Sequence, residues 1–530
     1  MIKMDKRLLY LEKYITDNIE DVTLAEYLNI SKRQLSRLLK QWVDEGYIKY
    51  TPAVGRGGKA EITFITDVEK ELFYYAMKHH KNMTLQEIND FLELPWDDES
   101  KEVIVKKLKE SFKQEDSSGN MVVDFVYSIP YTIHPHISQD IISFQVITQT
   151  NNTLYKLDKD NKILNEIVKY DEWKEQTLHI YLHKDIYFND KTKLTAQHVY
   201  DSLYALMFES NYCIYFGNVN KITIIDKYYL TIELCERTDH VKYLLAEPFA
   251  SIFKVKNGEL QGTGPYYLSF KDENEIKLSL NPYYKRVVLI DEILLIKNRK
   301  RFLEYISSNK YDKSLTKRVY IGNDMLVFNP NTTFSLEERH VIIEAMLYVL
   351  YEDNINNWKN FNWLLDEPQS RGDISNISRP VRMLVDQYNA EIMEKVRDEL
   401  NKTGYYIELI YTEHHNYLST SLKEYDVDIV WMSEAYNQKQ PFMLYDLLLH
   451  CKFKDWYIDD PNCIEFIKNY RYENFDQLEN IAKTILQSFE DRYLFANVLL
   501  KQKVFFYPSV VKYVDEDKYG YLDFGNAILK

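Results

Sequence analysis

The sequence predicts a multi-domain α/β protein, with a small helix-rich N-terminal part in front of a larger mixed body. Three observations support this prediction. The chain has 530 residues, enough for several domains of ordinary size. Apolar residues follow a helical period over residues 5–42, whereas short β-rich runs alternate with helices after residue 121. A composition of 45% hydrophobic and 28% charged residues is that of a globular chain and excludes a disordered or collagen-like one.

No feature of the sequence indicates export or a disulfide framework. The four cysteines, Cys213, Cys235, Cys451 and Cys463, are scattered and form no C-x-x-C pair, which argues against a zinc or thioredoxin-type site. The N-terminus alternates charged and apolar residues and lacks the apolar core of a signal peptide. No run approaches the length of a membrane-spanning helix. We therefore expect a cytoplasmic protein without membrane contact.

Three short helices are predicted at the N-terminus. The first covers residues 5–19, and the second follows Thr23, for which Glu26 completes a capping box. The third follows Ser31 and extends to Trp42, with an apolar stripe formed by Leu35, Leu38, Leu39 and Trp42. Two short helices joined by a tight turn, with polar and basic residues at the start of the second, are typical of a helix-turn-helix.

A basic hairpin is predicted after this pair of helices. Residues 47–51 and 60–65 have strand character and flank the loop 52–59, so the hairpin has the form of a wing. Residues 31–60 contain seven Lys or Arg against two acidic residues, in a chain of net charge −15. A phosphate backbone would be attracted here, although the charges could also be a solvated helix face. The DNA-binding residues that we predict are Ser31, Lys32, Arg33, Gln34, Ser36, Arg37 and Lys40 on the helix, and Arg56 and Lys59 on the wing.

The segment after the wing is helical again. Helices are expected over Asp67–Lys81, Thr84–Leu92 and Glu99–Phe112, and they either brace the winged domain or form a dimer contact. The polar, small-residue-rich stretch 114–120 is the best candidate for a linker.

The body after residue 121 has mixed α/β character and no internal repeats. About 400 residues of this kind favour two lobes over a single core. The strands that we expect are Met121–Tyr127, Leu178–Leu182, Lys221–Ile225, Tyr229–Leu234, Ile276–Leu280 and Val287–Ile296. Helices are expected at Thr195–Phe208 and Arg339–Tyr351.

Several motifs in this body resemble those of extracellular solute-binding proteins of family 5, the oligopeptide/nickel type. They occur in the family's order over roughly residues 130–530, and G-T-G-P-Y is the most specific of them. The matching stretches are Tyr187–Ser202, Gly262–Leu268, Asn281–Tyr284, Val327–Asn329, Glu338–Ala345 and Tyr425–Trp431. Lys191 and His198 depart from the family pattern, which has Gly and Asp at these places.

A winged helix-turn-helix joined to such a body resembles the SgrR-type transcriptional regulators. The resemblance implies a two-lobed fold like that of the periplasmic binding proteins. It also implies a winged domain at 1–66, a helical connector at 67–115, lobe I at 120–300, lobe II at 301–480 and a return to lobe I at 481–530. The acidic body and the basic N-terminal reader would then explain the net charge of −15.

The resemblance implies a ligand-responsive regulator whose partners are double-stranded DNA and a small solute; a homodimer is left open. The solute could be a peptide, a sugar derivative or another small metabolite bound between the lobes. Segments that line the cleft in the resembling proteins carry Tyr131, Tyr266, Phe328, Asn329, Trp431 and Tyr436, each of which could instead be a core residue. The alternative function is the solute-binding component of an ABC transporter with an unusual N-terminal protein-contact domain.

Enzyme activity is not expected. The chain has no H-E-x-x-H, G-x-S-x-G or Walker motif. Its paired histidines, His134 with His136 and His414 with His415, lack the acids at helical spacing that a metal site would need. We therefore predict neither a metal nor a cofactor.

Overall fold

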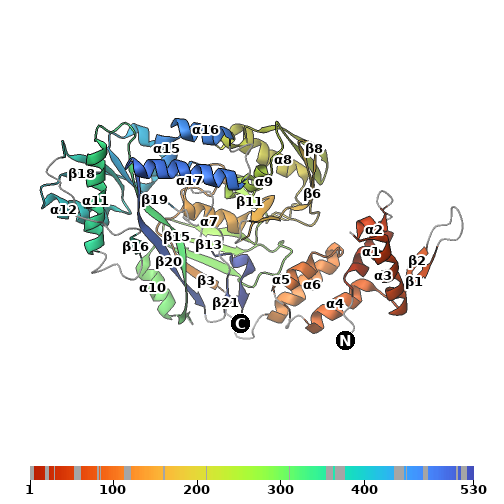
Figure 1. Cartoon of the computed structure of the whole chain (residues 1–530). Helices are drawn as coiled ribbons and strands as arrows, with labels where there is room; N and C mark the ends of the chain where they lie inside the picture. The colour runs from red at the N-terminus through yellow and green to blue at the C-terminus, as the bar shows by residue number, and fades with distance from the viewer. Residues whose placement is uncertain are drawn as a thin grey trace. The chain divides into compact units, whose positions relative to one another are not determined.

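The structure, a computed structural model of the chain, confirms the multi-domain α/β fold class (Figure 1). The chain divides into two compact units: Met1–Ser118 together with Lys285–Leu289, and Gly119–Tyr284 together with Ile290–Lys530. The residues that the structure describes are 5–17, 19, 23–28, 30–52, 61–79, 83, 85–112, 121–158, 162–210, 212–308, 311–353, 362–364, 377–434, 444, 447–448, 451–469, 475–508, 511–514 and 522–529.

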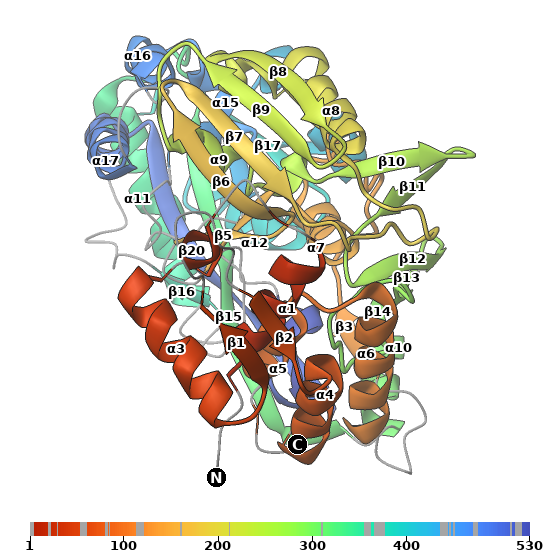
Figure 2. The same ribbon diagram turned by 90° about the vertical axis from the view of Figure 1, so that its right-hand side faces the viewer.

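The N-terminal unit begins with the order of elements of a winged helix-turn-helix. Its helices and strands are α1 (Arg7–Thr16), α2 (Leu24–Tyr27), α3 (Lys32–Asp44), β1 (Ile48–Thr51) and β2 (Glu61–Phe64). The two strands pair antiparallel, with Ile48 opposite Phe64 and Thr51 opposite Glu61. The hairpin lies beside α3 in both views (Figures 1 and 2). The expected wing tip, residues 53–60, lies outside the described residues.

Apolar stripes on the helices build the core of this domain. Leu8, Leu9 and Leu11 of α1 are buried. Three of the four residues predicted for the stripe of α3 are buried, namely Leu38, Leu39 and Trp42, while Leu35 is half-buried. The outward side of α3 stays in solvent because its residues fall between the positions of this stripe.

Three further helices complete the N-terminal unit: α4 (Val68–His79), α5 (Leu85–Leu92) and α6 (Asp98–Phe112). Their positions agree with the predicted helices to within a few residues. The indole of Trp96 packs on Phe91 and donates a hydrogen bond to its carbonyl oxygen at 2.9 Å, which fixes the bend between α5 and α6. The predicted linker 114–120 lies outside the described residues.

Lys285–Leu289 belongs to this unit, and the strand predicted for part of it is wrong. A strand was expected over Val287–Ile296, but the strand of the structure begins only at Glu292. The apolar run of Val287 to Ile290 is buried without belonging to any sheet. A run of buried apolar residues has the same appearance in a sequence whether it lies in a strand or in an irregular segment, which explains the error.

The first part of the larger unit contains two four-stranded sheets and two small hairpins. One sheet has the order β6-β7-β9-β8 and is antiparallel, and the other has the order β12-β13-β14-β3 with β14 parallel to β3. The strands are β3 (Met121–Phe125), β4 (Tyr155–Leu157), β5 (Ile163–Asn165), β6 (Val168–Lys174), β7 (Thr177–Leu182), β8 (Val219–Asp226), β9 (Tyr229–Leu234), β10 (Phe253–Lys256), β11 (Glu259–Gly262), β12 (Tyr266–Lys271), β13 (Glu275–Leu280) and β14 (Glu292–Ile296). The helices here are α7 (Ile141–Thr150), α8 (Ala196–Tyr204) and α9 (His240–Leu244).

The G-T-G-P-Y motif packs against the end of α7. A Cβ atom on Gly262 would lie 2.0 Å from the carbonyl oxygen of Thr150, and one on Gly264 would lie 2.5 Å from its carbonyl carbon. Only glycine allows two backbones to come this close. The buried Asn281 then donates its side-chain amide to the carbonyl oxygen of Gly264 at 2.9 Å, which joins the second family motif to the first.

The second part of the larger unit is built on a six-stranded sheet of order β16-β20-β15-β19-β17-β18. Its two long strands run antiparallel to each other, and both extend towards β3 and α10 (Figures 1 and 2). The strands are β15 (Tyr311–Phe328), β16 (Asn362–Leu364), β17 (Val381–Asp386), β18 (Ile407–Thr412), β19 (Ile429–Glu434) and β20 (Phe495–Pro508). The helices are α10 (Arg299–Ser308), α11 (Leu336–Asp353), α12 (Ala390–Asn401), α13 (His414–Ser419), α15 (Phe453–Tyr457), α16 (Pro461–Asn469) and α17 (Phe475–Asp491).

The C-terminal residues return to the first part of this unit. Strand β21 (Val511–Tyr513) pairs with β22 (Ile528–Leu529). The side chain of Gln149 donates to the carbonyl oxygen of Leu522 at 3.3 Å, and the Tyr266 hydroxyl donates to that of Phe524 at 3.2 Å. A C-terminal return was expected, while the residue boundaries of the predicted lobes stay a prediction. Within the described residues, no helix is both long and apolar enough to cross a membrane.

Candidate nucleic-acid interface and ligand cleft

The start of α3 is held by a capping box between Ser31 and Gln34. The backbone N–H of Ser31 donates to Oε1 of Gln34 at 2.9 Å, and the backbone N–H of Gln34 donates to Oγ of Ser31 at 3.2 Å. The predicted box of Thr23 and Glu26 is present at the start of α2. Both side chains satisfy the first backbone groups of the helix, and the predicted contact of Ser31 and Gln34 with DNA stays a prediction.

The basic residues of α3 form its exposed side. Lys32, Arg33, Arg37 and Lys40 all lie in solvent. Arg33, Arg37 and Lys40 are spaced by four and three residues, so they lie along one helix face. Ser36 is also exposed, but its hydroxyl donates to the carbonyl oxygen of Lys32 at 3.1 Å within the same helix.

The hairpin adds two exposed residues that were not predicted from the sequence. Lys49 is exposed on the outer face of β1, and Tyr50 is 37% exposed on the same strand. Lys49 directly follows the buried Ile48, so its side chain lies on the opposite face of the strand, and this position could have identified it. The predicted contacts Arg56 and Lys59 lie outside the described residues. We define the basic face of the N-terminal unit as Lys32, Arg33, Arg37, Lys40 and Lys49.

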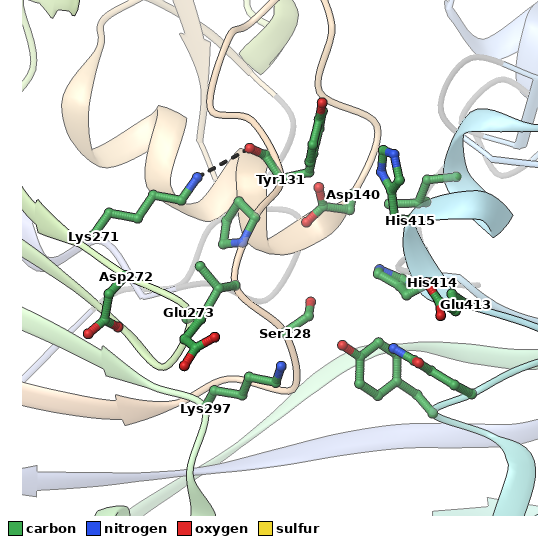
Figure 3. Close-up of a pocket in the computed structure, with 15 residues that line it drawn as sticks. Ser128, Tyr131, Asp140, Lys271, Asp272, Glu273, Lys297, Glu413, His414 and His415 are labelled. Carbon is green, nitrogen blue, oxygen red and sulfur yellow. Dashed lines mark hydrogen bonds between the residues drawn. The ribbon is translucent and has the colours of Figure 1, made fainter.

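A cavity of about 540 Å³ lies in the larger unit between its two parts. One wall comes from the loops after β3 and β12 and from the end of β14, and the other from the loop after β17 and from helix α13, which follows β18 (Figure 3). The lining residues are Ser128, Ile129, Pro130, Tyr131, Asp140, Lys271, Asp272, Glu273 and Lys297 on the first wall, and Gln387, Tyr388, Glu413, His414, His415 and Leu418 on the second.

The rings of Tyr131 and His415 meet across this cavity. Their centroids are 4.4 Å apart with an interplanar angle of 36° (Figure 3). The ammonium of Lys271 donates to the carbonyl oxygen of Tyr131 at 3.2 Å, which ties the Tyr131 loop to the end of β12. Partial burial lowers the pKa of the Lys271 ammonium, because it removes part of the water that solvates the charge. A hydrogen-bond acceptor or an anion beside this group stabilises its charged form.

The second wall lies at the carboxyl ends of parallel strands. Asp386 and Thr412 are the last residues of β17 and β18, which run parallel to each other. Nδ1 of His414 lies 2.5 Å from Oδ2 of Asp386, so this buried carboxylate sets the orientation of the imidazole. Loops at this edge of an α/β sheet are the usual place for a ligand, because they project beyond the rigid strands.

Both charge signs are present in the cleft. Lys271 and Lys297 lie on the first wall, and Glu413 lies on the second (Figure 3). Asp140 and Asp272 also line it, but Asp140 caps α7 through Ser143 and Asp272 accepts the backbone N–H groups of its own turn. The cleft can therefore hold a polar ligand through ring faces and a small number of charged groups.

The structure places one of the six predicted ligand residues, Tyr131, in this cavity. Tyr266, Phe328 and Trp431 have no exposed surface and belong to the core. Asn329 donates to the carbonyl oxygen of Val427 at 3.0 Å and stabilises a turn. Tyr436 lies outside the described residues. The lining residues that were not predicted include Lys271, Lys297 and Glu413, which no motif distinguished from other surface charges.

Neither histidine pair belongs to a metal-binding cluster: among the residues that the structure describes, no group of three or more His, Cys, Asp and Glu could hold a metal ion. His134 and His136 pack on the ring of Phe253, and burial lowers the pKa of His136 to about 4. The His136 imidazole is therefore neutral near pH 7, and its role in this aromatic cluster is packing.

Two family models match the chain. Residues 8–115 match "Sugar transport-related sRNA regulator N-term", and residues 169–310 match "Bacterial extracellular solute-binding proteins, family 5 Middle". The HTH-type transcriptional regulator SgrR of Salmonella typhimurium is 22% identical over 307 residues, which cover 55% of this chain and 53% of that protein. SgrR of Yersinia enterocolitica is 22% identical over 283 residues, covering 51% and 49%. The chain thus spans about half the length of the curated relatives it matches.

Solved structures resemble the larger unit in fold. NikA from Staphylococcus aureus in complex with Ni(L-His)2 has a TM-score of 0.63 and 16% identity, covering 78% of this chain and all of that one. The murein tripeptide binding protein MppA of Escherichia coli has a TM-score of 0.62 and 12% identity, covering 78% and 99%. These likenesses confirm the binding-protein-like fold. The names of the matched relatives describe regulators and solute-binding proteins, in agreement with the prediction that the chain is not an enzyme.

Proposed function

We propose, from this combination of an SgrR N-terminal domain with a family 5 solute-binding domain, that the chain is a ligand-responsive transcriptional regulator acting in the cytoplasm. The observation that carries the proposal is the basic face of the N-terminal unit. Four basic residues are exposed on α3 while its apolar stripe is buried, and the hairpin beside it adds Lys49. A capped helix with an exposed basic side is the element that enters a major groove.

In this proposal, residues of the basic face have two roles. Arg33 and Arg37 reach base edges, because arginine can donate two parallel hydrogen bonds to guanine. The lysines act as point charges and neutralise phosphates; they are Lys32, Lys40 and Lys49. The wing residues Arg56 and Lys59 add contacts to a flanking phosphate or the minor groove. Ser31 and Gln34 contribute by holding the first turn of α3 in place.

The solute is proposed to bind in the cleft of the larger unit. Tyr131 and His415 would enclose it, while Lys271, Lys297 and Glu413 supply charged partners. A sugar derivative or a peptide fits these groups, and the name of the matching N-terminal family, which refers to sugar transport, supports the former. The regulated genes would then be those for transport of this solute or for the stress it causes. Closure of the cleft around the solute changes the affinity for DNA only if the open and closed states of the chain bind DNA with different free energies.

DNA binding is tested by fluorescence anisotropy with a labelled duplex from upstream of the protein's own gene, from 20 to 300 mM salt. The triple variant Arg33→Ala/Arg37→Ala/Lys40→Ala should bind at least tenfold more weakly at low salt. Its plot of log K against log salt should be less steep by about 0.9 for each phosphate that is no longer neutralised. A matched control changes three exposed lysines of the larger unit, Lys174, Lys300 and Lys402. Equal affinity of the two triple variants, or no binding at 20 mM salt, would favour a transporter component instead.

A further inference from the structure

Five residues between β13 and β14 belong to the N-terminal unit rather than to the unit that contains these strands. We call this segment, Lys285–Leu289, the strap. The chain therefore passes between the two units three times: once after Ser118, once before the strap and once after it. A DNA-binding domain attached by one linker would need only the first of these passages.

The strap is fixed to α5 and α6 by specific polar contacts. Nε and a terminal guanidinium nitrogen of Arg286 both lie 3.0 Å from Oε1 of Glu93, just after α5. The backbone N–H of Val287 donates to Oδ1 of the buried Asn89 at 3.3 Å. The ammonium of Lys285 lies 3.5 Å from the carboxylate of Glu102 on α6.

The apolar residues of the strap are part of a core. Val287 has no exposed surface, Val288 is 2% exposed and Leu289 is 8% exposed. Any movement that placed these three side chains in water would be opposed by the hydrophobic effect. As long as the polar contacts with α5 and α6 are kept, the strap and these helices move together.

Both ends of the strap continue into hydrogen-bonded structure of the larger unit. Before it, the backbone N–H of Asn281 donates to the carbonyl oxygen of Pro265 at 2.8 Å, within the family motif. After it, β14 pairs with β13 on one side and with β3 on the other. The loop that follows β3 carries Tyr131 of the cleft. One sheet therefore carries both a wall of the cleft and the two ends of the strap.

Contacts also lead from the strap-binding helices to α3. The ammonium of Lys6, the residue before α1, lies 5.8 Å from the ring centroid of Phe91 in α5. On α1, Tyr10 and Tyr14 contact Tyr27 of α2, with ring centroids 6.4 and 5.3 Å apart. Helix α2 precedes α3 in the helix-turn-helix, so packed side chains connect the strap to the basic face.

We propose that the strap is a second, mechanical connection that couples the cleft to the DNA-binding domain. This inference rests on the proposed function. When the walls of the cleft change their separation, the sheet β12-β13-β14-β3 shifts the strap, and the strap shifts α5 and α6. Breaking the strap's polar contacts should leave DNA binding intact and remove its dependence on the state of the cleft.

The test fixes the cleft without a ligand. In the full chain, the exposed Cys213 and Cys235 are changed to serine, and Tyr131→Cys/His415→Cys are joined by a short bis-maleimide across the cleft. The probe is a labelled 20-base-pair duplex of mixed sequence at 20 mM salt. With the strap intact, cross-linking should change the dissociation constant at least threefold.

The strap is then altered in a charge-swap series. Arg286→Glu places a like charge against Glu93 and should reduce the effect of cross-linking to less than 1.5-fold, without abolishing DNA binding. Arg286→Glu/Glu93→Arg restores an opposite pair and should restore the threefold effect. Arg301→Glu is the matched control, because Arg301 forms an ion pair with Glu275 at 2.8 Å within the larger unit.

The outcomes separate this inference from the proposed function. No DNA binding in any variant would contradict the proposed function itself. If cross-linking of the cleft does not change the dissociation constant for DNA while the strap is intact, the coupling is overturned. An equal effect of cross-linking in the parent chain and in Arg286→Glu would show that the coupling uses the linker after Ser118 and would overturn the role of the strap. Hydrogen exchange of α5 in Arg286→Glu confirms that the helix remains folded.

Discussion

Ser31 and Gln34 hold each other at the first turn of α3. Each side chain accepts a hydrogen bond from the backbone N–H of the other residue, at 2.9 Å and 3.2 Å. Both residues are polar and exposed at the start of α3, the helix that we predict to contact DNA, so the sequence alone favours contact with DNA. The capping box shows that these side chains also have a structural use, because they determine where α3 begins.

The first prediction separates capping from recognition. Ser31→Ala should destabilise the N-terminal unit by about 1 kcal/mol, the usual cost of removing a capping side chain. It should weaken binding to all duplexes by a similar factor, because it removes no base contact. Arg37→Ala should instead reduce discrimination between the operator and a shuffled duplex by ~1–3 kcal/mol. Thermal unfolding followed by circular dichroism, with anisotropy on both duplexes, measures both effects. A loss of discrimination in Ser31→Ala would show that Ser31 reads bases.

The second prediction concerns the wing. Arg56→Ala/Lys59→Ala should lower affinity similarly for all sequences, because these residues are proposed to meet phosphate or the minor groove. The plot of log K against log salt should become less steep by about 0.9 for each phosphate that the variant leaves without its cation. Lys300→Ala/Lys402→Ala, at exposed positions of the larger unit, is the control. An unchanged slope in the wing variant would remove the wing from the interface.

The sequence was sufficient for the winged domain because local rules determine each of its elements. Thr23 and Ser31 are helix caps, and Leu38, Leu39 and Trp42 follow the helical period. The family motifs were recognisable for a related reason. Gly262 and Gly264 touch the backbone at the end of α7, where no other residue fits. The fold therefore requires glycine at these two positions of the motif.

The cleft could not be predicted in the same way, because its walls come from loops far apart in the chain. Trp431 and Phe328 looked like ligand contacts, yet they lie on strands of the six-stranded sheet and have no exposed surface. Lys271 and His415 become neighbours of Tyr131 only through tertiary packing. The strap was missed for the same reason, since its partner Asn89 lies 198 residues before Val287 in the sequence.

The third prediction distinguishes core from cleft aromatics. Trp431→Ala should destabilise the larger unit by about 3–5 kcal/mol, because it empties a fully buried site. Tyr131→Ala should change stability by much less, since Tyr131 is exposed at the cleft wall. Urea unfolding of the full chain, followed by tryptophan fluorescence and circular dichroism, gives both values. Similar destabilisation in the two variants would contradict this assignment.

The fourth prediction concerns the solute. In a thermal-shift screen of the full chain with sugar phosphates, free sugars and dipeptides, a compound that binds the cleft should raise the melting temperature of the larger unit. At a hundredfold excess over the dissociation constant the stabilisation is about 2.7 kcal/mol. Lys271→Met and Glu413→Gln should each reduce the shift, whereas Lys300→Ala should not. A shift that is the same in all three variants would place the compound outside the cleft.

The last prediction is a pH dependence of the N-terminal unit. Partial burial, together with the negative charges of Glu69 and Asp67, raises the pKa of Glu12 on α1 from 4.5 to about 7. The folded unit therefore binds this proton more tightly than the unfolded chain does. The resulting stabilisation is complete below pH 4.5 and is lost as the pH rises through about 7.

Glu12→Gln should remove this dependence and stabilise the unit at pH 8 by on the order of 1 kcal/mol. The effect stays below the ~1.36 kcal/mol per pKa unit of an unscreened group because solvent reaches the half-buried side chain. Thermal unfolding at pH 5 and pH 8 measures the difference, with Glu391→Gln as an exposed control on α12. If Glu12→Gln and the parent chain are destabilised equally between these two pH values, Glu12 is not the group that titrates. In that case Glu69, whose pKa is also raised by partial burial, becomes the residue to change.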